Sequence, residues 1–289
     1  MLTDYHLHLR PDDLGAKAED YFSESVVASY RTVAEERGIA ELGVSEHVYR
    51  FEQALAVWRH PLWREFAIDD LDAYCEFVRE RTDLRLGIEA DFVAGSEDRM
   101  ANLLETRDFD YVVGSVHFLR DESIDMDDHT IWGAGHSPEE IWTCYFEALG
   151  AAARSGLFDI LAHPDLVKVW GRSHPERPFP EGDLRRYYEP AIEAIAETGI
   201  AVEVSTAGLR KGAQELYPAP LFLAMCREAG APVTLSSDAH RPEDVGADYD
   251  QALELLGEVG YTELCLFERR VRRSAPIGAG IPAAEAGRR

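Results

Sequence analysis

Six of the ten histidines in this 289-residue chain follow short apolar segments of the kind that form buried β-strands. Two acidic residues occupy similar positions. The eight residues are His6, His8, His47, Glu89, His117, His163, Asp238 and His240. Imidazole and carboxylate groups are normal protein ligands of zinc, manganese and iron. The pattern therefore predicts a metal centre, provided that the fold brings the ends of these segments together.

The segment His6-Leu7-His8 carries the most local information. Side chains two positions apart on a strand point to the same side, so His6 and His8 are able to bind one ion together. A single histidine at a strand end is more often structural. A structural role does not explain six histidines that all lie at the ends of predicted strands.

The elements that must position these residues alternate along the chain. Seven short apolar runs, expected to be strands, are separated by longer amphipathic stretches, expected to be helices. The predicted strands are 2–6, 41–45, 84–90, 111–116, 158–162, 200–205 and 232–236. The predicted helices are 23–37, 69–81, 137–155, 181–198, 217–229 and 242–259. Such alternation is typical of a parallel α/β sheet.

About seven strand–helix units in a chain of this length favour a closed or nearly closed barrel, in which the carboxyl ends of the strands share one face. A doubly wound open sheet is the alternative, but no glycine-rich nucleotide-binding segment follows the first strand. We expect one domain over residues 1–273. Residues 274–289 are rich in Ala, Gly and Pro, and we expect them to form a flexible tail.

The composition restricts the partners. The net charge of −25 disfavours nucleic acids and anionic membranes, since both bind clustered basic residues. A small anionic substrate is compatible if a bound metal supplies a local positive centre. The chain shows neither a membrane-length apolar run nor a signal-peptide pattern at its start, so we expect a cytoplasmic protein. The sequence does not indicate an oligomeric state.

Four scattered cysteines without a CxxC pair predict reduced, buried thiols rather than disulfides or a cysteine-rich zinc site. A mononuclear site of the amidohydrolase type is an alternative reading of the histidine pattern, because it also begins with HxH after the first strand. That type of site usually includes a metal-bridging lysine, and none of Lys17, Lys168 and Lys211 occupies a suitable strand end. At about four ligands per ion, eight or nine candidate ligands suit two or three ions.

The segments HLH, SEH, SVH, AHPD and SDAH, with Glu89, resemble the PHP (polymerase and histidinol phosphatase) superfamily. The segments GSVHFLRDES, EVSTAGLRK and SSDAHRPEDVG resemble its histidinol-phosphate phosphatase branch more narrowly. The resemblance covers residues 2–256. It implies a distorted (β/α)7 barrel of the TIM type, and a metal-dependent phosphatase of histidine biosynthesis that hydrolyses L-histidinol phosphate to L-histidinol and phosphate.

The resemblance also implies two or three divalent ions (Zn, Mn or Fe). The first would be bound by His6, His8, Glu89 and Asp238. The second would share Glu89 and add His117 and His163, and the third would take His47, His240 and one further residue.

The family commonly supplies that further residue as a histidine, where this chain has Leu14. Asp12 or Asp13 could substitute, and we favour Asp13; a poorly occupied third site is the alternative. Glu46 stands where an aspartate is commoner in the family, and we expect it to orient a ligand histidine.

The expected reaction is in-line attack on phosphorus by a metal-bridging hydroxide. Arg210, in the STAGLRK segment, is the expected phosphate ligand because a guanidinium matches phosphate bidentately. Arg120 and Lys168 are further candidates for substrate binding. We assign Arg210, Asp238 and His240 as catalytic. The sequence does not identify the general acid, for which His240 or a metal-bound water could serve.

The long loop over residues 120–135 contains three acids that would suit the positive groups of histidinol phosphate: Asp125, Asp127 and Asp128. A solvated acidic face is the alternative for them. His129 and Trp132 of the same loop are candidates for the pocket border. The alternative functions are hydrolysis of another small phosphate monoester or of a nucleotide diester, and metal binding without catalysis.

Overall fold

The computed structural model describes residues 1–11 and 15–277, and a seven-stranded parallel sheet forms its centre. The strand order is β1-β2-β3-β4-β7-β8-β9, so neighbours in the sheet follow each other along the chain. The strands are β1 (Leu2–Asp4), β2 (Ile39–Val44), β3 (Arg85–Asp91), β4 (Tyr111–Ser115), β7 (Ile160–Leu161), β8 (Ala201–Ser205) and β9 (Val233–Ser236). All seven predicted strands are therefore present, although β7 is shorter than the predicted 158–162.

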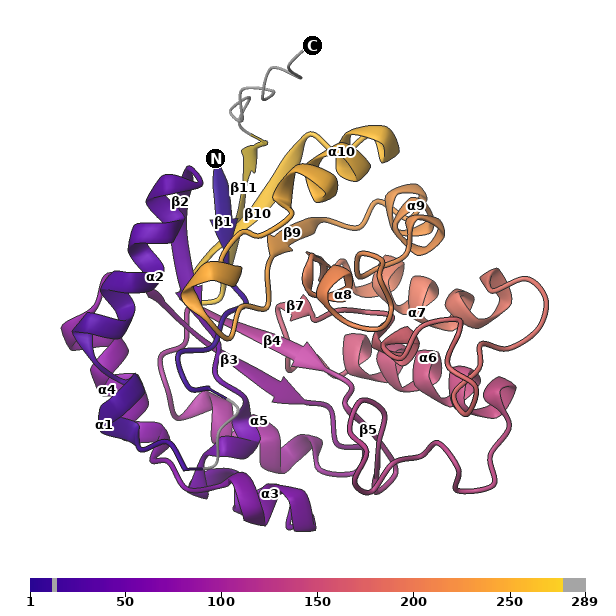
Figure 1. The fold of residues 1–289 in the computed structure, drawn as a ribbon, viewed down its shortest axis with the longest axis horizontal. Coiled ribbons are helices and arrows are strands. Elements are labelled where there is room, and N and C mark those ends of the chain that lie inside the picture. Colours follow the sequence, from indigo (N-terminus) through magenta and orange to yellow (C-terminus); the bar gives the residue numbers. More distant parts are fainter. Residues whose placement is uncertain (12–14, 278–289) are drawn as a thin grey trace.

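The two ends of this strand order meet. Leu7, just after β1, forms a parallel bridge with Ala239, just after β9, and the amide of His8 donates to the Ala239 carbonyl at 2.8 Å. The sheet is thus a nearly closed barrel, as predicted, and not an open doubly wound sheet. Figure 1 shows the strands at the centre with helices around them.

The six predicted helices are also present. They are α2 (Glu24–Glu36), α4 (Leu71–Arg81), α6 (Pro138–Arg154), α7 (Arg185–Thr198), α9 (Pro220–Glu228) and α10 (Tyr249–Val259). Ser23, Asp70 and Ser137 cap the first three by accepting hydrogen bonds from backbone amides of the first turn. Helix α10 begins later than predicted because residues Pro242–Asp244 form a separate 3-10 turn, η4.

Shorter elements that the sequence did not predict occupy the connections. The helices are α1 (Ala18–Tyr21), α3 (Pro61–Phe66), α5 (Glu97–Glu105) and α8 (Ala207–Arg210). The other 3-10 turns are η1 (Val48–Arg50), η2 (Glu52–Ala56) and η3 (Leu166–Lys168). The strands β5 (Phe118–Leu119) and β6 (Glu122–Ser123) form a small hairpin in the loop after β4.

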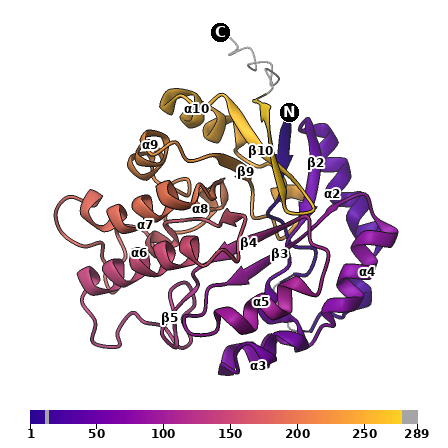
Figure 2. The ribbon, with the colours of Figure 1, turned by 180° about the vertical axis from the view of Figure 1, so that it is seen from behind.

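A C-terminal hairpin covers the end of the barrel opposite the predicted site. Strand β10 (Glu263–Glu268) pairs antiparallel with β11 (Val271–Pro276), and Phe267 packs with Tyr5 and Tyr111. Figure 2 shows this hairpin beside β1. The predicted domain boundary at residue 273 is corrected by this pairing, because residues 274–276 belong to β11. Residues 278–289 of the predicted tail lie outside the described residues.

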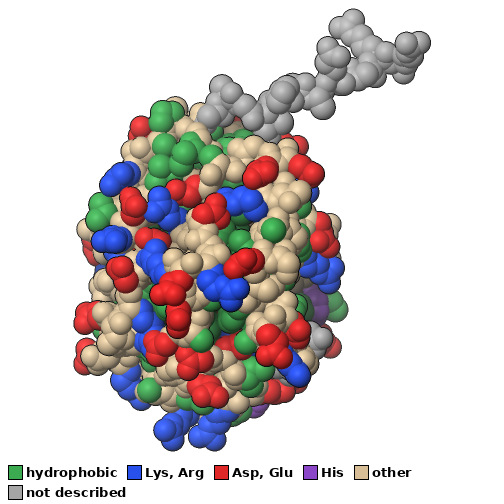
Figure 3. Space-filling model, turned by 90° about the vertical axis from the view of Figure 1, so that its left-hand side faces the viewer, with side chains coloured by type: hydrophobic (Ala, Val, Ile, Leu, Met, Phe, Trp, Pro, Cys, Tyr) green, Lys and Arg blue, Asp and Glu red, His purple; other side chains and the backbone are tan. Residues whose placement is uncertain are grey.

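Acidic and basic side chains are interspersed on the face that Figure 3 shows. Exposed ion pairs join neighbouring helices, for example Arg81 of α4 with Glu24 of α2 at 2.9 Å. All four cysteines are free thiols; two of them are buried and two are half-buried. None of the described helices is long and apolar enough to cross a membrane.

Packing inside the barrel leaves no room for a side chain at Gly87 of β3. A Cβ atom there would lie 2.3 Å from Cζ of the buried Tyr111. We expect Gly87→Ala to lower the free energy of unfolding by about 1–3 kcal/mol, the usual cost of overpacking.

Gly257 of α10 is the control, because a Cβ there meets no atom within 4 Å. We expect Gly257→Ala to be neutral or stabilising, since alanine favours helix. Denaturant unfolding measures both, and a Gly87→Ala protein as stable as the wild type would contradict this packing.

Candidate metal centre

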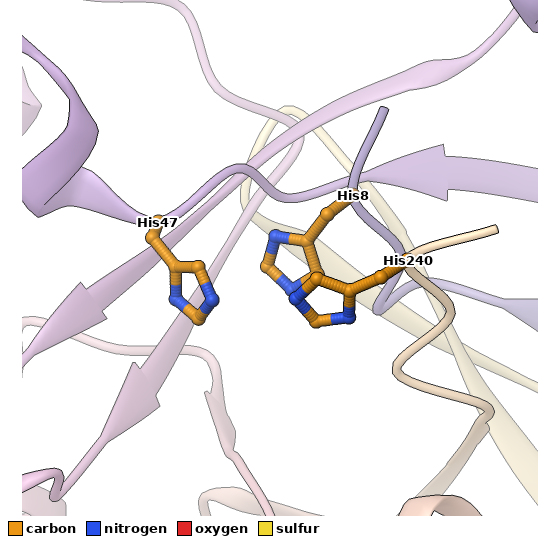
Figure 4. A group of neighbouring side chains, drawn as sticks. All are labelled: His8, His47 and His240. Carbon is orange, nitrogen blue, oxygen red and sulfur yellow. The ribbon is translucent and has the colours of Figure 1, made fainter. Parts of the chain in front are cut away.

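The eight residues predicted from the strand ends lie together at one mouth of the barrel. Their ligand atoms form four overlapping triplets, each within 4.8 Å: His8/His47/His240, His6/His8/Asp238, His6/Glu89/His163 and His47/Glu89/His117. Because the triplets share members, they form one continuous cluster. Figure 4 shows the imidazoles of His8, His47 and His240 approaching from three separate segments. Asp13, the predicted further ligand, lies outside the described residues.

The HLH segment behaves as its spacing predicts. Leu7 is buried in the barrel wall, where it bridges Ala239. His6 and His8 therefore point together to the other side, with ring centroids 5.1 Å apart. The alternating side-chain directions of a β-strand thus continue for four residues beyond the end of β1.

Glu89 is the centre of the cluster, and only 1% of its surface is exposed. One of its oxygens, Oε2, lies 2.5 Å from Nδ1 of His47 and 3.2 Å from Nε2 of His6. The other, Oε1, lies 3.1 Å from Nε2 of His163 and 3.4 Å from Nε2 of His117. Burial by itself raises the pKa of Glu89, but the surrounding imidazoles, His47 foremost, hold that pKa well below its usual value. Glu89 is therefore an ionised carboxylate.

Several buried atoms of the cluster lie close to one another but form no hydrogen bond of normal geometry among the described residues. They are Nε2 of His6, both ring nitrogens of His8, Nδ1 of His47 and of His163, Oε2 of Glu89 and Oδ1 of Asp238. A buried polar atom left unsatisfied costs about 1–3 kcal/mol, so such a concentration needs a common partner. Carboxylate oxygens and unprotonated imidazole nitrogens are electron-pair donors that divalent cations satisfy. The residues present thus fit a metal centre.

A further layer of carboxylates lies behind the imidazoles. Glu203 of β8 accepts a hydrogen bond from Nδ1 of His6 at 2.8 Å, and Asp91 of β3 accepts one from Nδ1 of His117 at 2.8 Å. Each contact fixes the ring and leaves Nε2 directed at Glu89, an arrangement typical of metal-ligating histidines. The sequence analysis missed both acids. Their signal was a carboxylate in a largely apolar strand: Glu203 is the one charged residue of β8, and Asp91 lies two positions after Glu89 in β3.

Glu203 also ties three strands together. Its Oε2 accepts from the amide of His163 at 2.5 Å, and its Oε1 accepts from the Ser236 hydroxyl at 2.7 Å. One carboxylate of β8 thereby positions His6 after β1, His163 after β7 and the end of β9. The segment after β9 then carries Asp238 and His240.

Glu46, predicted to orient a ligand histidine, lies 3.8 Å from Nδ1 of His8. Its Oε1 accepts from the amides of Leu9 and Arg10 at 2.6 and 3.0 Å, and its Oε2 pairs with Arg50 at 2.8 Å. Burial raises the pKa of Glu46, but the nearby imidazole of His8 and the charge of Arg50 lower it to about 2. A permanent carboxylate thus holds the chain just after the HLH segment.

Two candidate ligands have an unusual backbone conformation. Asp238 has φ 49° and His163 has φ 22°, values that residues other than glycine rarely adopt. Such residues persist when the surrounding structure fixes them, and they occur often at functional sites. Asp238 and His163 each follow the end of a strand. In this backbone conformation their side chains turn back over the mouth of the barrel.

The cluster forms the floor of a cavity of about 410 Å³. Tyr49, Phe66 and Trp170 contribute aromatic walls, and Asp125 and Lys211 contribute opposite charges. Trp170 is held in place because its Nε1 donates to the carbonyl of Ile124 at 2.7 Å. The cavity therefore joins a metal-binding floor to walls suited to a small, dipolar, partly aromatic molecule.

Arg210, predicted to bind phosphate, has a different position from the one expected. Its guanidinium donates to the carbonyl of Ser237 at 2.5 Å and lies 3.6 Å from Asp244. The one-turn helix α8 directs it toward the segment that carries Asp238, and it is not among the described residues lining the cavity. The next residue, Lys211, lines the cavity instead. Arg210 thus positions the Asp238 segment.

Arg120 and Lys168 are not among the described residues that line this cavity either. Arg120 is exposed and borders a separate cavity with His136 and Cys144. Lys168 is buried, and its Nζ contacts Asp165, Glu215 and the Leu216 carbonyl at 2.7–2.9 Å. Both positions correct the substrate-binding roles predicted for these residues.

Of the loop acids, Asp125 lines the cavity, whereas Asp127 pairs with Arg177 and Asp128 is exposed. The two predicted border residues do not line the cavity in the described part of the chain. Trp132 is buried and donates to the Ile124 carbonyl at 3.0 Å. His129 is exposed, with its ring 5.4 Å from that of His60.

Known proteins share both the sequence and the fold. The family model for the PHP domain matches residues 21–207. A Deinococcus radiodurans protein named "Probable histidinol-phosphatase" is 33% identical over 245 residues, which cover 84% of this chain and 91% of that protein. The histidinol-phosphatase of Bacillus subtilis is 30% identical over 201 residues, 65% of this chain and 74% of that protein.

The fold has a close counterpart among solved structures. The histidinol phosphate phosphatase of Lactococcus lactis, complexed with zinc, L-histidinol and phosphate, superposes with a TM-score of 0.69 and 18% identity. The match covers 94% of this chain and 98% of that one. At this identity the likeness establishes the architecture, a barrel of parallel strands with helices outside.

We expect Glu203→Gln to weaken divalent-metal binding by about 10–100-fold, the usual effect of removing a carboxylate behind a ligand histidine. The variant keeps the side-chain size but loses the charge that holds Nδ1 of His6. Glu197→Gln is the matched control, because Glu197 is an exposed acid of α7 paired only with Arg154 in the described structure. Competition with a chromogenic chelator measures the affinity. A Glu203→Gln protein that binds zinc as tightly as the control would contradict this role.

Proposed function

The chain belongs to the PHP domain family, and from that premise we propose that it hydrolyses L-histidinol phosphate to L-histidinol and inorganic phosphate. The observation that carries the proposal is the cluster around Glu89, which floors a cavity with Lys211 and Asp125 in its walls. The substrate has a phosphate at one end and an amine and imidazole at the other. Curated relatives named as histidinol-phosphatases, aligned over most of their length, support the same reaction.

We infer that the cluster holds two or three divalent cations, of zinc, manganese or iron. One would be bound by His6, His8 and Asp238. Another would be bound by Glu89, His117 and His163, since Oε1 of Glu89 lies 3.4 and 3.1 Å from Nε2 of the two histidines. A third would be bound by His47 and His240, because the imidazole of His8 already serves the first ion. Bound there, such ions would activate a water molecule as nucleophile and polarise the phosphoryl oxygens. The zinc named for the Lactococcus lactis structure supports this choice of metals.

The residues behind the cluster keep its geometry ready for the reaction. Glu203 and Asp91 hold their histidines with Nδ1 protonated and Nε2 directed inward. Arg210 holds the carbonyl of Ser237, so that the neighbouring Asp238 stays at the floor of the cavity. The burial of the floor excludes bulk water and strengthens electrostatic interactions with the ester.

The walls orient the substrate. Lys211 is a flexible cation at the edge of the cavity and supplies a positive charge for the phosphate. Asp125 offers a carboxylate to the ammonium or imidazolium group, and Tyr49, Phe66 and Trp170 pack against the imidazole ring. In the proposed complex, the phosphate lies over the histidine cluster and the amino-alcohol portion lies against the loop after β4.

The reaction is tested by measuring released phosphate from histidinol phosphate, sugar phosphates and nucleotide diesters with zinc or manganese present. We expect kcat/KM for histidinol phosphate to exceed the others by at least about 100-fold, since its charged groups have partners in the walls. Similar values for all monoesters would leave a general phosphatase, and preference for a diester would overturn the proposed substrate. Metal binding without turnover of any ester would point to a non-catalytic metal-binding protein.

We expect Lys211→Met to lower kcat/KM for histidinol phosphate by about 10–100-fold, because it removes a charge-assisted contact worth about 1.5–3 kcal/mol. The effect should lie mainly in KM, and metal content should stay unchanged. Lys17→Met is the control, since Lys17 is exposed and precedes α1. Steady-state kinetics and elemental analysis of both variants measure this. Wild-type kinetics in Lys211→Met would show that another group binds the phosphate.

A further inference from the structure

Tyr217 carries a buried hydroxyl with no hydrogen-bond partner among the described residues. Only 1% of the residue is exposed, yet it lines the same cavity as His163, Asp238 and Lys211. Tyrosine hydroxyls in protein interiors are normally bonded, because an unsatisfied buried donor costs free energy. A hydroxyl of this kind at the wall of a binding cavity is explained if a ligand supplies the missing acceptor.

The ring of Tyr217 is fixed on several sides. Its backbone amide donates to the Ser205 carbonyl at 3.0 Å, and its own carbonyl accepts from the Ser205 amide at 2.6 Å. A Cβ on Gly208 would lie 2.1 Å from the Glu215 carbonyl oxygen and 3.1 Å from the ring, so glycine is what lets α8 pass this close. Nζ of Lys168 lies 5.4 Å from the ring centroid, and the imidazole of His163 lies 6.2 Å away, edge-on. The hydroxyl is therefore held in one place before any ligand arrives.

The same contacts explain the position of Lys168. Its ammonium is bonded to Asp165, Glu215 and the Leu216 carbonyl, next to the ring of Tyr217. The lysine that the sequence suggested as a substrate ligand thus supports the wall in which Tyr217 stands. The side chain that reaches the cavity is the tyrosine.

The surroundings of the hydroxyl select an acceptor brought by the substrate. The carboxylates of Asp238 and Asp125, which also line the cavity, act electrostatically on the Tyr217 hydroxyl without forming a hydrogen bond to it. Within the proposed function, the strongest acceptors that the substrate brings are phosphoryl oxygens, and these must lie near the histidine cluster that includes His163.

We propose that the Tyr217 hydroxyl donates a hydrogen bond to a phosphoryl oxygen of the bound ester and is a further catalytic residue. The identity of the ester rests on the proposed function, whereas the contact to phosphate does not. No proton is transferred in this role. The hydroxyl fixes the phosphoryl group in place over the cluster, in the cavity that Lys211 also lines.

The test uses Tyr217→Phe, which removes the oxygen and keeps the ring. We expect the dissociation constant of inorganic phosphate for the metal-loaded protein to rise about tenfold, equivalent to about 1.4 kcal/mol, with a similar loss in kcat/KM. Metal content should stay unchanged. The melting temperature should not fall, because the hydroxyl has no bond to lose within the described protein.

Tyr261→Phe is the matched control. The hydroxyl of Tyr261 is also buried without a hydrogen-bond partner in the described structure, but it borders a different cavity, beside Arg227 and β10. Its removal should leave phosphate binding and kinetics as in the wild type. The two variants therefore differ only in whether the lost hydroxyl faces the site.

The two variants test the contact between Tyr217 and phosphate separately from the identity of the substrate. Wild-type phosphate affinity in Tyr217→Phe would overturn the contact. Loss of metal, or a lower melting temperature than that of Tyr261→Phe, would overturn it as well, because the hydroxyl would then act through the protein. Weaker phosphate binding in Tyr217→Phe, together with a wild-type protein that ignores histidinol phosphate, would refute the proposed substrate and keep the role of Tyr217.

Discussion

Glu89 is an ionised carboxylate with 1% of its surface exposed, and it keeps its charge because imidazoles surround it. The barrel satisfies this constraint by placing a histidine after four different strands around one acid. Carboxylates behind the rings, Glu203 and Asp91, then fix which nitrogen of each ring faces inward. A cluster of buried charges is stable while each charge has its partner. Removing one partner leaves a buried charge uncompensated and destabilises the fold.

An acidic chain needs local positive charge to bind an anion. The net charge of −25 makes the surface unfavourable for polyanions, whereas the proposed cations and Lys211 concentrate positive charge inside one small cavity. This charge placement favours a small anion over a polyanion. The walls after β4 and β7 add a carboxylate and aromatic rings for the rest of the molecule.

The sequence predicted the strands and the histidines because both obey local rules: apolar runs mark buried strands, and parallel strand ends converge in a barrel. It did not predict side chains whose direction depends on tertiary contacts. Arg210 and Lys211 are adjacent, and only the orientation of the one-turn helix α8 decides which reaches the cavity. Lys168 is buried by Glu215, 47 positions away. Residues 274–276, the last three of β11, resembled the start of a tail because the partner strand β10 and the packing of Phe267 are not visible in their own composition.

Anomalous scattering from crystals of the zinc-loaded protein tests the central idea, convergence of the strand-end ligands on several cations, most directly. We expect two or three peaks at the barrel mouth, each about 2.0–2.2 Å from nitrogen or oxygen atoms of the cluster around Glu89. Absence of peaks there, or zinc bound only at other histidines such as His129 or His174, would contradict it.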